Sequence, residues 1–172
     1  MRGRTPAGDI EPHEFRRTVG SFATGVTVIT SRGRGGDHAM TANSFTSLSL
    51  TPPLVLVCVA RRSSGRGVIA ANRAFAINIL GAGQQDLARR FASADRPRGD
   101  RTFEGVPHKR ARTESPLLEG AAAHIECLLA GEHAAGDHVV LVGRVVGLAV
   151  QHDTAPLVFH GGGYRALEAA RE

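Results

Sequence analysis

Seven runs of this chain have the length and composition of β-strands, and they do not alternate regularly with helical segments. A doubly wound α/β fold places a helix between successive parallel strands, so this pattern argues against that class. It favours a mainly β, antiparallel barrel with Greek-key-like connections and a few short peripheral helices. The runs are residues 26–32, 38–50, 54–60, 74–80, 121–136, 137–150 and 156–160.

Several of these runs are apolar on both faces, as in the sequence LVLVCVA at 54–60. In a small barrel one face of each strand fills the interior, and the other face normally meets water. We therefore expect helices or a second subunit to cover the outside of the barrel, and a homodimer is the most economical cover.

Three segments have helical patterns. Residues 9–24 place Phe15, Val19 and Phe22 on one face and predict an amphipathic helix that ends at Gly25. Residues 63–72 predict a short helix that begins with two hydroxyl side chains, and residues 84–93 predict another. A polar turn is expected at 131–137, and an exposed, arginine-rich loop at 94–112.

The 172 residues suit one domain, which we place at 12–167 between a flexible tail at 1–11 and a second tail at 168–172. Residues 1–10 lack the apolar stretch of a signal peptide, and no run reaches the ~20 residues of a membrane span. A cytoplasmic protein with no membrane association is expected.

The net charge of +5 raises the possibility of nucleic-acid binding. The segment 89–112 alone contains eight basic and three acidic residues, which accounts for the whole excess. With no Trp and one Tyr, the basic residues are not interleaved with stacking aromatics. Nucleic acid is therefore a minor alternative, which a steep salt dependence of binding would reveal.

The sequence predicts no metal site. Cys58 and Cys127 lie far apart in apolar runs and form no CxxC pair, as expected of buried, reduced thiols. His124 and Cys127 are three apart on an expected strand, so their side chains point to opposite faces.

Two polar features are candidate ligand sites. In the expected strand 38–50 one face is unusually polar, which suits either solvent or a polar ligand, and it consists of Thr41, Asn43, Phe45, Ser47 and Ser49. Ser63 and Ser64 open a helix behind Arg61 and Arg62, which suits either a phosphate or an ordinary helix cap.

Eight motifs between about residues 12 and 165 carry a family resemblance: FRRTVGSFATGVTVIT, MTANSFTSLSLTPPLVLVCV, RRSS, FAINIL, LARRFA, LLEGAAAHIEC, EHAAGDH and PLVFHGGGYR. In order and approximate spacing they resemble the flavin reductase-like family, whose short-chain NAD(P)H-dependent reductases supply reduced flavin to two-component monooxygenases. The resemblance implies an FMN-binding split β-barrel and a homodimer with flavin near the subunit interface.

The resemblance also implies roles for individual residues. Lining the isoalloxazine ring and ribityl chain would be Thr41, Ala42, Asn43, Ser44 and Phe45, with Ser47 nearby. Beside the ring would run Cys58, Val59 and Ala60, and the flavin phosphate would meet Ser63 and Ser64. Arg90 would neutralise phosphate, and Phe91 would pack on flavin or the dinucleotide.

The remaining implied residues concern the nicotinamide. Gly136, Asp137 and His138 match a GDH motif, and His160 with Tyr164 match a terminal HxxxY-type segment. His138 is the candidate catalytic residue, which would orient the nicotinamide or help to protonate reduced flavin. A turn-closing role for His138 and a packing role for His160 are the alternatives.

Three departures from the family pattern stand out. Arg89 replaces a serine, Thr51 stands where Asp commonly precedes the two prolines, and His38 stands where a small or aromatic residue is common. His38 lies just before the flavin segment, so it is a candidate for altering flavin preference.

The expected reaction is hydride transfer from NADH or NADPH to FMN or FAD, with reduced flavin passing to a separate monooxygenase. The alternative is a flavin-binding or flavin-carrier split barrel without a nicotinamide-dependent reaction of its own.

Overall fold

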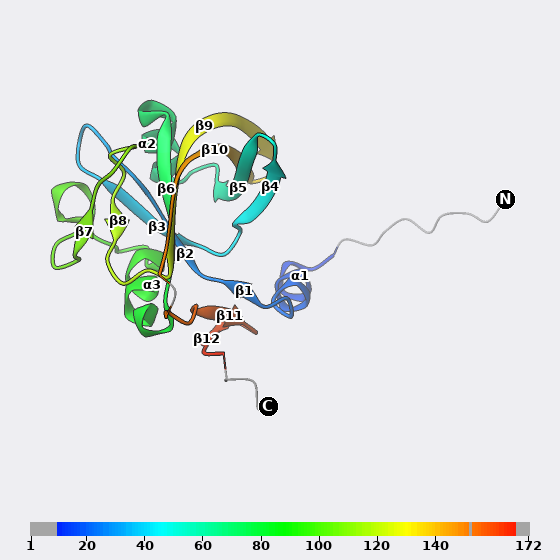
Figure 1. The fold of residues 1–172 in the computed structure, drawn as a ribbon. Helices are drawn as coiled ribbons and strands as arrows, with labels where there is room; N and C mark the ends of the chain where they lie inside the picture. The colour runs from blue at the N-terminus through cyan, green and yellow to red at the C-terminus, as the bar shows by residue number, and fades with distance from the viewer. Residues whose placement is uncertain (1–9, 152, 168–172) are drawn as a thin grey trace.

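The computed structural model describes residues 10–151 and 153–167, and its main element is a curved, seven-stranded antiparallel sheet (Figure 1). Its strands follow the order β3 (His38–Ala42), β2 (Thr27–Ser31), β6 (Ala74–Ile79), β9 (Ala123–Ala135), β10 (His138–Val150), β5 (Pro53–Ala60) and β4 (Thr46–Leu50). Bulges between the two long strands β9 and β10 help to curve the sheet. The predicted mainly β, antiparallel fold is confirmed. The tail residues 1–9 and 168–172 lie outside the described residues.

Two small sheets and three helices complete the fold. One small sheet consists of β1 (Thr24–Gly25), β11 (Val158–His160) and β12 (Gly163–Arg165), and the other of β7 (His108–Lys109) and β8 (Leu117–Leu118). The helices are α1 (Pro12–Val19), α2 (Ser64–Asn72) and α3 (Gln85–Ala92), with 3₁₀ turns at Ala82–Gln84 and Gly99–Arg101. In the part of the chain described, no helix has the length and apolar character needed to cross a membrane.

Strand β2 is buried on both faces along its whole length. Ile29 packs inside the barrel with Phe75 and Ile77, whereas Val28 packs on the outside with Phe91 of α3 and Leu118. Helix α3 and the loop after it therefore cover this side of the sheet, as the two-sided apolar pattern predicts.

The prediction of one strand over 38–50 is wrong. The structure interrupts it at Asn43–Phe45, and β3 and β4 lie at opposite ends of the strand order. The interruption is held by Ser44, whose hydroxyl donates to the carbonyl of Cys58 at 2.9 Å and accepts from its N–H at 3.0 Å. This side chain takes the place of a ladder partner, so the polar residues at 41–49 do not share one face.

The predicted helix over 9–24 is shorter than expected. Helix α1 ends at Val19, with Gly20 as its C-cap, and Thr24–Gly25 already belong to β1, which pairs with β11. None of its residues is buried, and Phe15 and Val19 are 58% and 51% exposed. The apolar face that defines this helix has no partner in the described part of the chain.

The turn predicted at 131–137 is also shorter. Strand β9 continues to Ala135, and only Gly136 and Asp137 join it to β10. Gly136 has φ +59°, a conformation that glycine adopts without strain. The tight hairpin therefore places His138 directly opposite Ala60 on β5.

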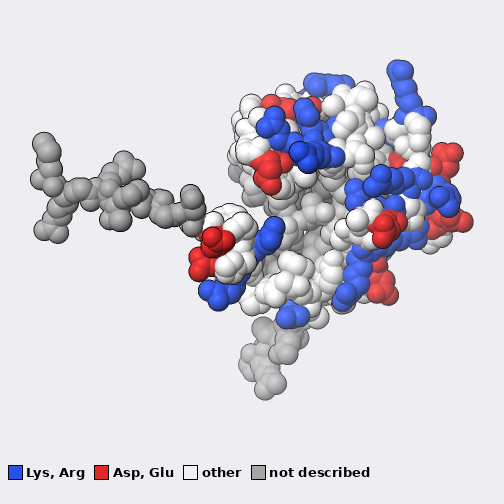
Figure 2. Space-filling model, turned by 180° about the vertical axis from the view of Figure 1, so that it is seen from behind, with Lys and Arg blue, Asp and Glu red and all other residues white. Residues whose placement is uncertain are grey.

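The arginine-rich loop over 94–112 is exposed at most of its charged residues but anchored at its centre. Phe103 is 8% exposed, and its ring lies 5.7 Å from that of Phe91. Figure 2 shows positive side chains intermixed with negative ones on the face seen from behind. Arg110 of this loop forms an ion pair with Asp37, and Arg32, outside the loop, forms one with Glu114. Part of the local basic excess is thus paired within the fold.

Candidate functional site

A cavity of about 560 Å³, here called the main cavity, lies where β3, β5 and α3 end and where α2 and β10 begin. Its lining residues are Met40, Thr41, Ala42, Asn43, Ser44, Cys58, Val59, Ala60, Arg62, Ser63, Phe91, Ala92, Arg96 and His138. Segments up to about a hundred residues apart in the chain therefore meet at one end of the barrel.

Most of the residues predicted from the sequence meet in this cavity. They are Thr41, Ala42, Asn43, Ser44, Cys58, Val59, Ala60, Ser63, Phe91 and His138. The predicted residues that do not line it are Phe45, Ser47, Ser64, Arg90, Gly136, Asp137, His160 and Tyr164. Among these, Ser47 is exposed on β4 and His160 is exposed on β11.

Two hydroxyl groups that line the cavity form hydrogen bonds within the protein. The Thr41 hydroxyl donates to the carbonyl of Ala88 in α3 at 2.7 Å, and the Ser44 hydroxyl is bonded to Cys58. These bonds fix the segment between β3 and β4. Among the described residues the Asn43 side chain forms no hydrogen bond, and Asn43 borders three adjoining cavities.

Ser63 is the N-cap of α2, and its hydroxyl accepts from the N–H of Gly65 at 3.2 Å. The cap predicted from the sequence is confirmed, while its phosphate-binding role stays a prediction. Arg62 and Arg96 line the cavity beside this cap. The sequence drew attention to Arg62 because it precedes the two serines, but nothing in the pattern singled out Arg96.

His138 and Asp137 form a hydrogen-bonded pair, with 2.7 Å between His138 Nδ1 and Asp137 Oδ1. The contact lowers the pKa of the Asp137 carboxyl below its ordinary value, chiefly through this hydrogen bond and also through the charge of His138. Arg61 steadies the turn, since its backbone N–H donates to the carbonyl of Asp137 at 2.9 Å. The Asp137 side chain therefore orients the imidazole from outside the cavity.

The adjacent residues Arg90 and Phe91 point to different surroundings. Phe91 is fully buried and also lines the main cavity. Arg90 donates to the carbonyl of Glu104 at 2.9 Å, so its guanidinium holds the 94–112 loop against α3. Its Nε is buried without a hydrogen-bond partner.

Tyr164 borders a second cavity of about 230 Å³, which shares Thr41, Ala42, Asn43 and Ala92 with the main cavity. Its ring packs edge-on against Phe159, with 5.4 Å between the ring centres. The guanidinium of Arg89 lies over the Tyr164 ring, 5.4 Å from its centre. The sequence placed Tyr164 near the site but missed this partner, because 75 positions separate it from Arg89.

His38 lies beside Gly65, in the first turn of α2. Burial lowers the pKa of its imidazole to about 4, with Arg96 and Arg98 adding a smaller electrostatic effect. Its Nε2 is buried and has no hydrogen-bond partner. At neutral pH this histidine is uncharged.

Cys127 is buried, as the sequence predicts, whereas Cys58 is only half-buried. Both are free, and burial, aided by the Glu126 charge, raises the pKa of the Cys127 thiol to about 12. No three His, Cys, Asp or Glu side chains within residues 10–151 and 153–167 gather in the manner of a metal site.

The barrel and its end cavity define a small antiparallel split barrel with a ligand site built from strand ends and helix ends. The model of the flavin reductase like domain matches residues 19–168, and the chain belongs to this family. The family resemblance seen in the sequence is thereby confirmed.

Several relatives of known activity are similar to this chain. The reductase subunit of a flavin-dependent monooxygenase from Rhodococcus jostii is 38% identical over 96% of this chain and 83% of its own. An NADH-dependent FMN reductase from Agrobacterium fabrum is 39% identical over 92% of this chain and 87% of its own. The solved structure of an NADH:FAD oxidoreductase from Streptomyces globisporus matches with a TM-score of 0.87 at 38% identity, covering 96% of this chain and 100% of the other.

Proposed function

We propose that this chain is an NADH-dependent flavin reductase that supplies reduced flavin to a separate monooxygenase component. The observation that carries the proposal is the convergence of five segments on one cavity, at the positions where the family resemblance places flavin contacts. Relatives that act on FAD or on FMN with NADH, at comparable identity over most of the chain, support the same reaction.

The main cavity suits a flavin in both shape and chemistry. The Asn43 amide supplies polar groups for the edge of a ring, and Phe91 supplies an apolar wall. Arg62, Ser63 and Arg96 supply two positive charges and a hydroxyl for a phosphate. A bound flavin would supply the hydride-accepting centre, while the protein aligns the reactants and excludes water.

His138 is proposed to act on the nicotinamide side. Its Nδ1 is engaged with Asp137, so Nε2 is the ring nitrogen available to a ligand in the cavity. From there it would orient the carboxamide or carry a proton to reduced flavin. Tyr164, in the adjoining cavity, would limit the space open to the dinucleotide.

A second copy of this chain is proposed to cover α1. Phe15, Val19 and Phe22 are all more than half exposed, and so are Leu50 and Leu148 on the strands β4 and β10. Such exposed apolar side chains on a small domain suit a homodimer interface. Phe22 also borders a cavity that contains Asn43, so a partner subunit seated there would lie next to the flavin.

The test is to mix the protein anaerobically with FMN or FAD and with NADH or NADPH, and to follow the flavin absorbance. We expect bleaching with NADH. If no flavin is bleached by either nicotinamide while flavin still binds, the chain is a flavin carrier, and the proposed reaction is refuted.

His138→Ala tests the role of the histidine. We expect the rate of hydride transfer to fall about 10²-fold or more, as for loss of a positioned acid or base, while the Kd of oxidised flavin changes by less than about threefold. Stopped-flow absorbance measures the rate, and fluorescence titration measures the Kd. Equal losses in both quantities would instead assign His138 a structural role.

A further inference from the structure

A groove of about 660 Å³ runs between the glycine-rich hairpin at 32–37 and the outer face of α2. The hairpin contributes Arg32, Arg34 and the backbone of its glycines, and the helix contributes Ser64, Gly67 and Val68. We call it the hairpin–α2 groove. None of these residues lines the main cavity.

The groove begins where the main cavity ends. Ser63 lines the main cavity and Ser64, the next residue, lines the groove. A ligand whose phosphate lies at the start of α2 would therefore reach either space. His38 follows the hairpin and packs against Gly65, and its uncharged imidazole adds no positive charge to those of Arg96 and Arg98.

The two walls of the groove differ in chemistry. The helix wall is formed by Gly67, Val68 and Ala71, which offer an apolar surface for a flat ring. The hairpin wall carries Arg34, which forms no ion pair with any described residue, and Arg32, whose pair with Glu114 is half exposed. A flat apolar surface opposite guanidinium groups suits a base joined to phosphate.

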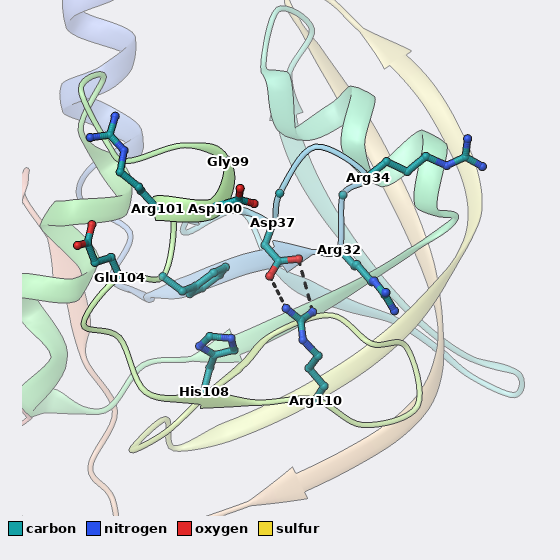
Figure 3. Close-up of a pocket in the computed structure, with 12 residues that line it drawn as sticks. Arg32, Arg34, Asp37, Gly99, Asp100, Arg101, Glu104, His108 and Arg110 are labelled. Carbon is teal, nitrogen blue, oxygen red and sulfur yellow. Dashed lines mark hydrogen bonds and ion pairs between the residues drawn. The ribbon is translucent and has the colours of Figure 1, made fainter.

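A neighbouring pocket of about 640 Å³ on the other side of the same hairpin lacks this character (Figure 3). Arg32 and Arg34 border this pocket too, but there Arg110 is paired with Asp37, and Asp100 and Glu104 offset positive charge that the groove leaves without an acidic neighbour. In Figure 3 the Arg34 side chain extends away from this Asp37–Arg110 pair. The hairpin–α2 groove is therefore the better place for an anionic ligand.

We infer that the hairpin–α2 groove binds the adenosine phosphate half of FAD, so that this chain binds FAD more tightly than FMN. The inference rests on the proposed function, because it requires the flavin ring to occupy the main cavity. FMN ends at the phosphate beside Ser63 and would leave the groove empty.

The test measures the Kd of oxidised FAD and of oxidised FMN by fluorescence titration, with no nicotinamide present. For the wild type we expect a lower Kd for FAD than for FMN. Arg34→Ala should raise the Kd of FAD about tenfold and that of FMN less than twofold, since one charge-assisted contact is lost.

A second variant tests the shape of the groove. A Cβ at Gly67 meets no atom within 4 Å, so Gly67→Leu fits the fold and places its side chain in the groove. We expect it to bring the Kd of FAD close to that of FMN. Arg66→Ala is the matched control, since Arg66 lies on the same helix, pairs with Glu132 on β9 and does not line the groove.

Equal wild-type Kd values for FAD and FMN, or equal changes for both flavins in Arg34→Ala, would overturn the inference. The inference would also be overturned if Arg34→Ala raised the KM of NADH without changing the Kd of FAD, since the groove would then bind the nicotinamide dinucleotide. Failure of the reductase proposal is distinguishable, because it shows as absence of flavin reduction with either flavin.

Discussion

Helices α1 and α3 have the same length, eight residues, and the same kind of amphipathic pattern, yet the structure treats them differently. Helix α3 buries Ala88 and Phe91 against β2 and β3, and it forms one wall of the main cavity. Helix α1 buries none of its residues. An amphipathic pattern thus indicates that a helix needs a partner surface, but not whether that surface belongs to its own chain.

The largest effect is expected where α3 meets the core. Phe91→Ala should lower the free energy of unfolding by about 3–5 kcal/mol, because it removes a fully buried ring and leaves a cavity. Denaturant unfolding measures the loss. Leu87→Ala, at a half-buried position of the same helix, should cost less; an effect of Phe91→Ala below that of Leu87→Ala would contradict the packing described for α3.

A second prediction tests whether α1 finds its partner in another copy. The double variant Phe15→Asp, Val19→Asp should raise the dimer Kd at least about 30-fold, because two apolar contacts become buried charges. The helical content should stay near that of the wild type. Sedimentation equilibrium gives the mass, and an unchanged dimer would refute an interface formed by α1.

The third prediction concerns His38, whose imidazole is buried and lies within electrostatic range of Arg96, beyond the end of α3. The pKa of His38 is about 4 in the folded protein and 6.5 in its ordinary state, so the unfolded chain binds more protons between these values. The free energy of unfolding should therefore have its full value above pH 6.5. It should fall as the pH drops towards 4, by on the order of 1–2 kcal/mol after allowance for solvent screening.

His38→Gln removes this titration and should flatten the pH dependence of unfolding between pH 6.5 and 4 relative to the wild type. His13→Gln, on the exposed helix α1, is the matched control and should leave the wild-type slope unchanged. A slope that persists in His38→Gln would assign the effect to other groups.

The smallest expected effect is the coupling energy between an arginine in the last turn of each helix and the Tyr164 ring. Arg89 lies over the Tyr164 ring, whereas Arg17 on α1 contacts no described aromatic ring. A double-mutant cycle of Arg89→Ala with Tyr164→Leu should give a coupling energy of about 0.5–1 kcal/mol. The same cycle with Arg17→Ala should give none, and an equal coupling in both cycles would contradict the contact.

Much of the candidate site was predictable because its motifs are local. The hydroxyl pair before α2 marks a helix start, and the pattern around Phe91 marks a buried helix face, so both follow from a few neighbouring residues. The 38–50 run could not be read in this way. Its strand propensity is continuous, and the bond that interrupts it joins Ser44 to Cys58 on another strand.

The sequence by itself determined the mainly β class and the family, because periodicity and motifs are properties of neighbouring residues. Only the tertiary structure decided that β3 and β4 lie at opposite ends of the sheet, that Arg96 meets Ser63 at one cavity, and that α1 lacks cover in its own chain. These outcomes depend on contacts between distant segments, which local patterns do not encode.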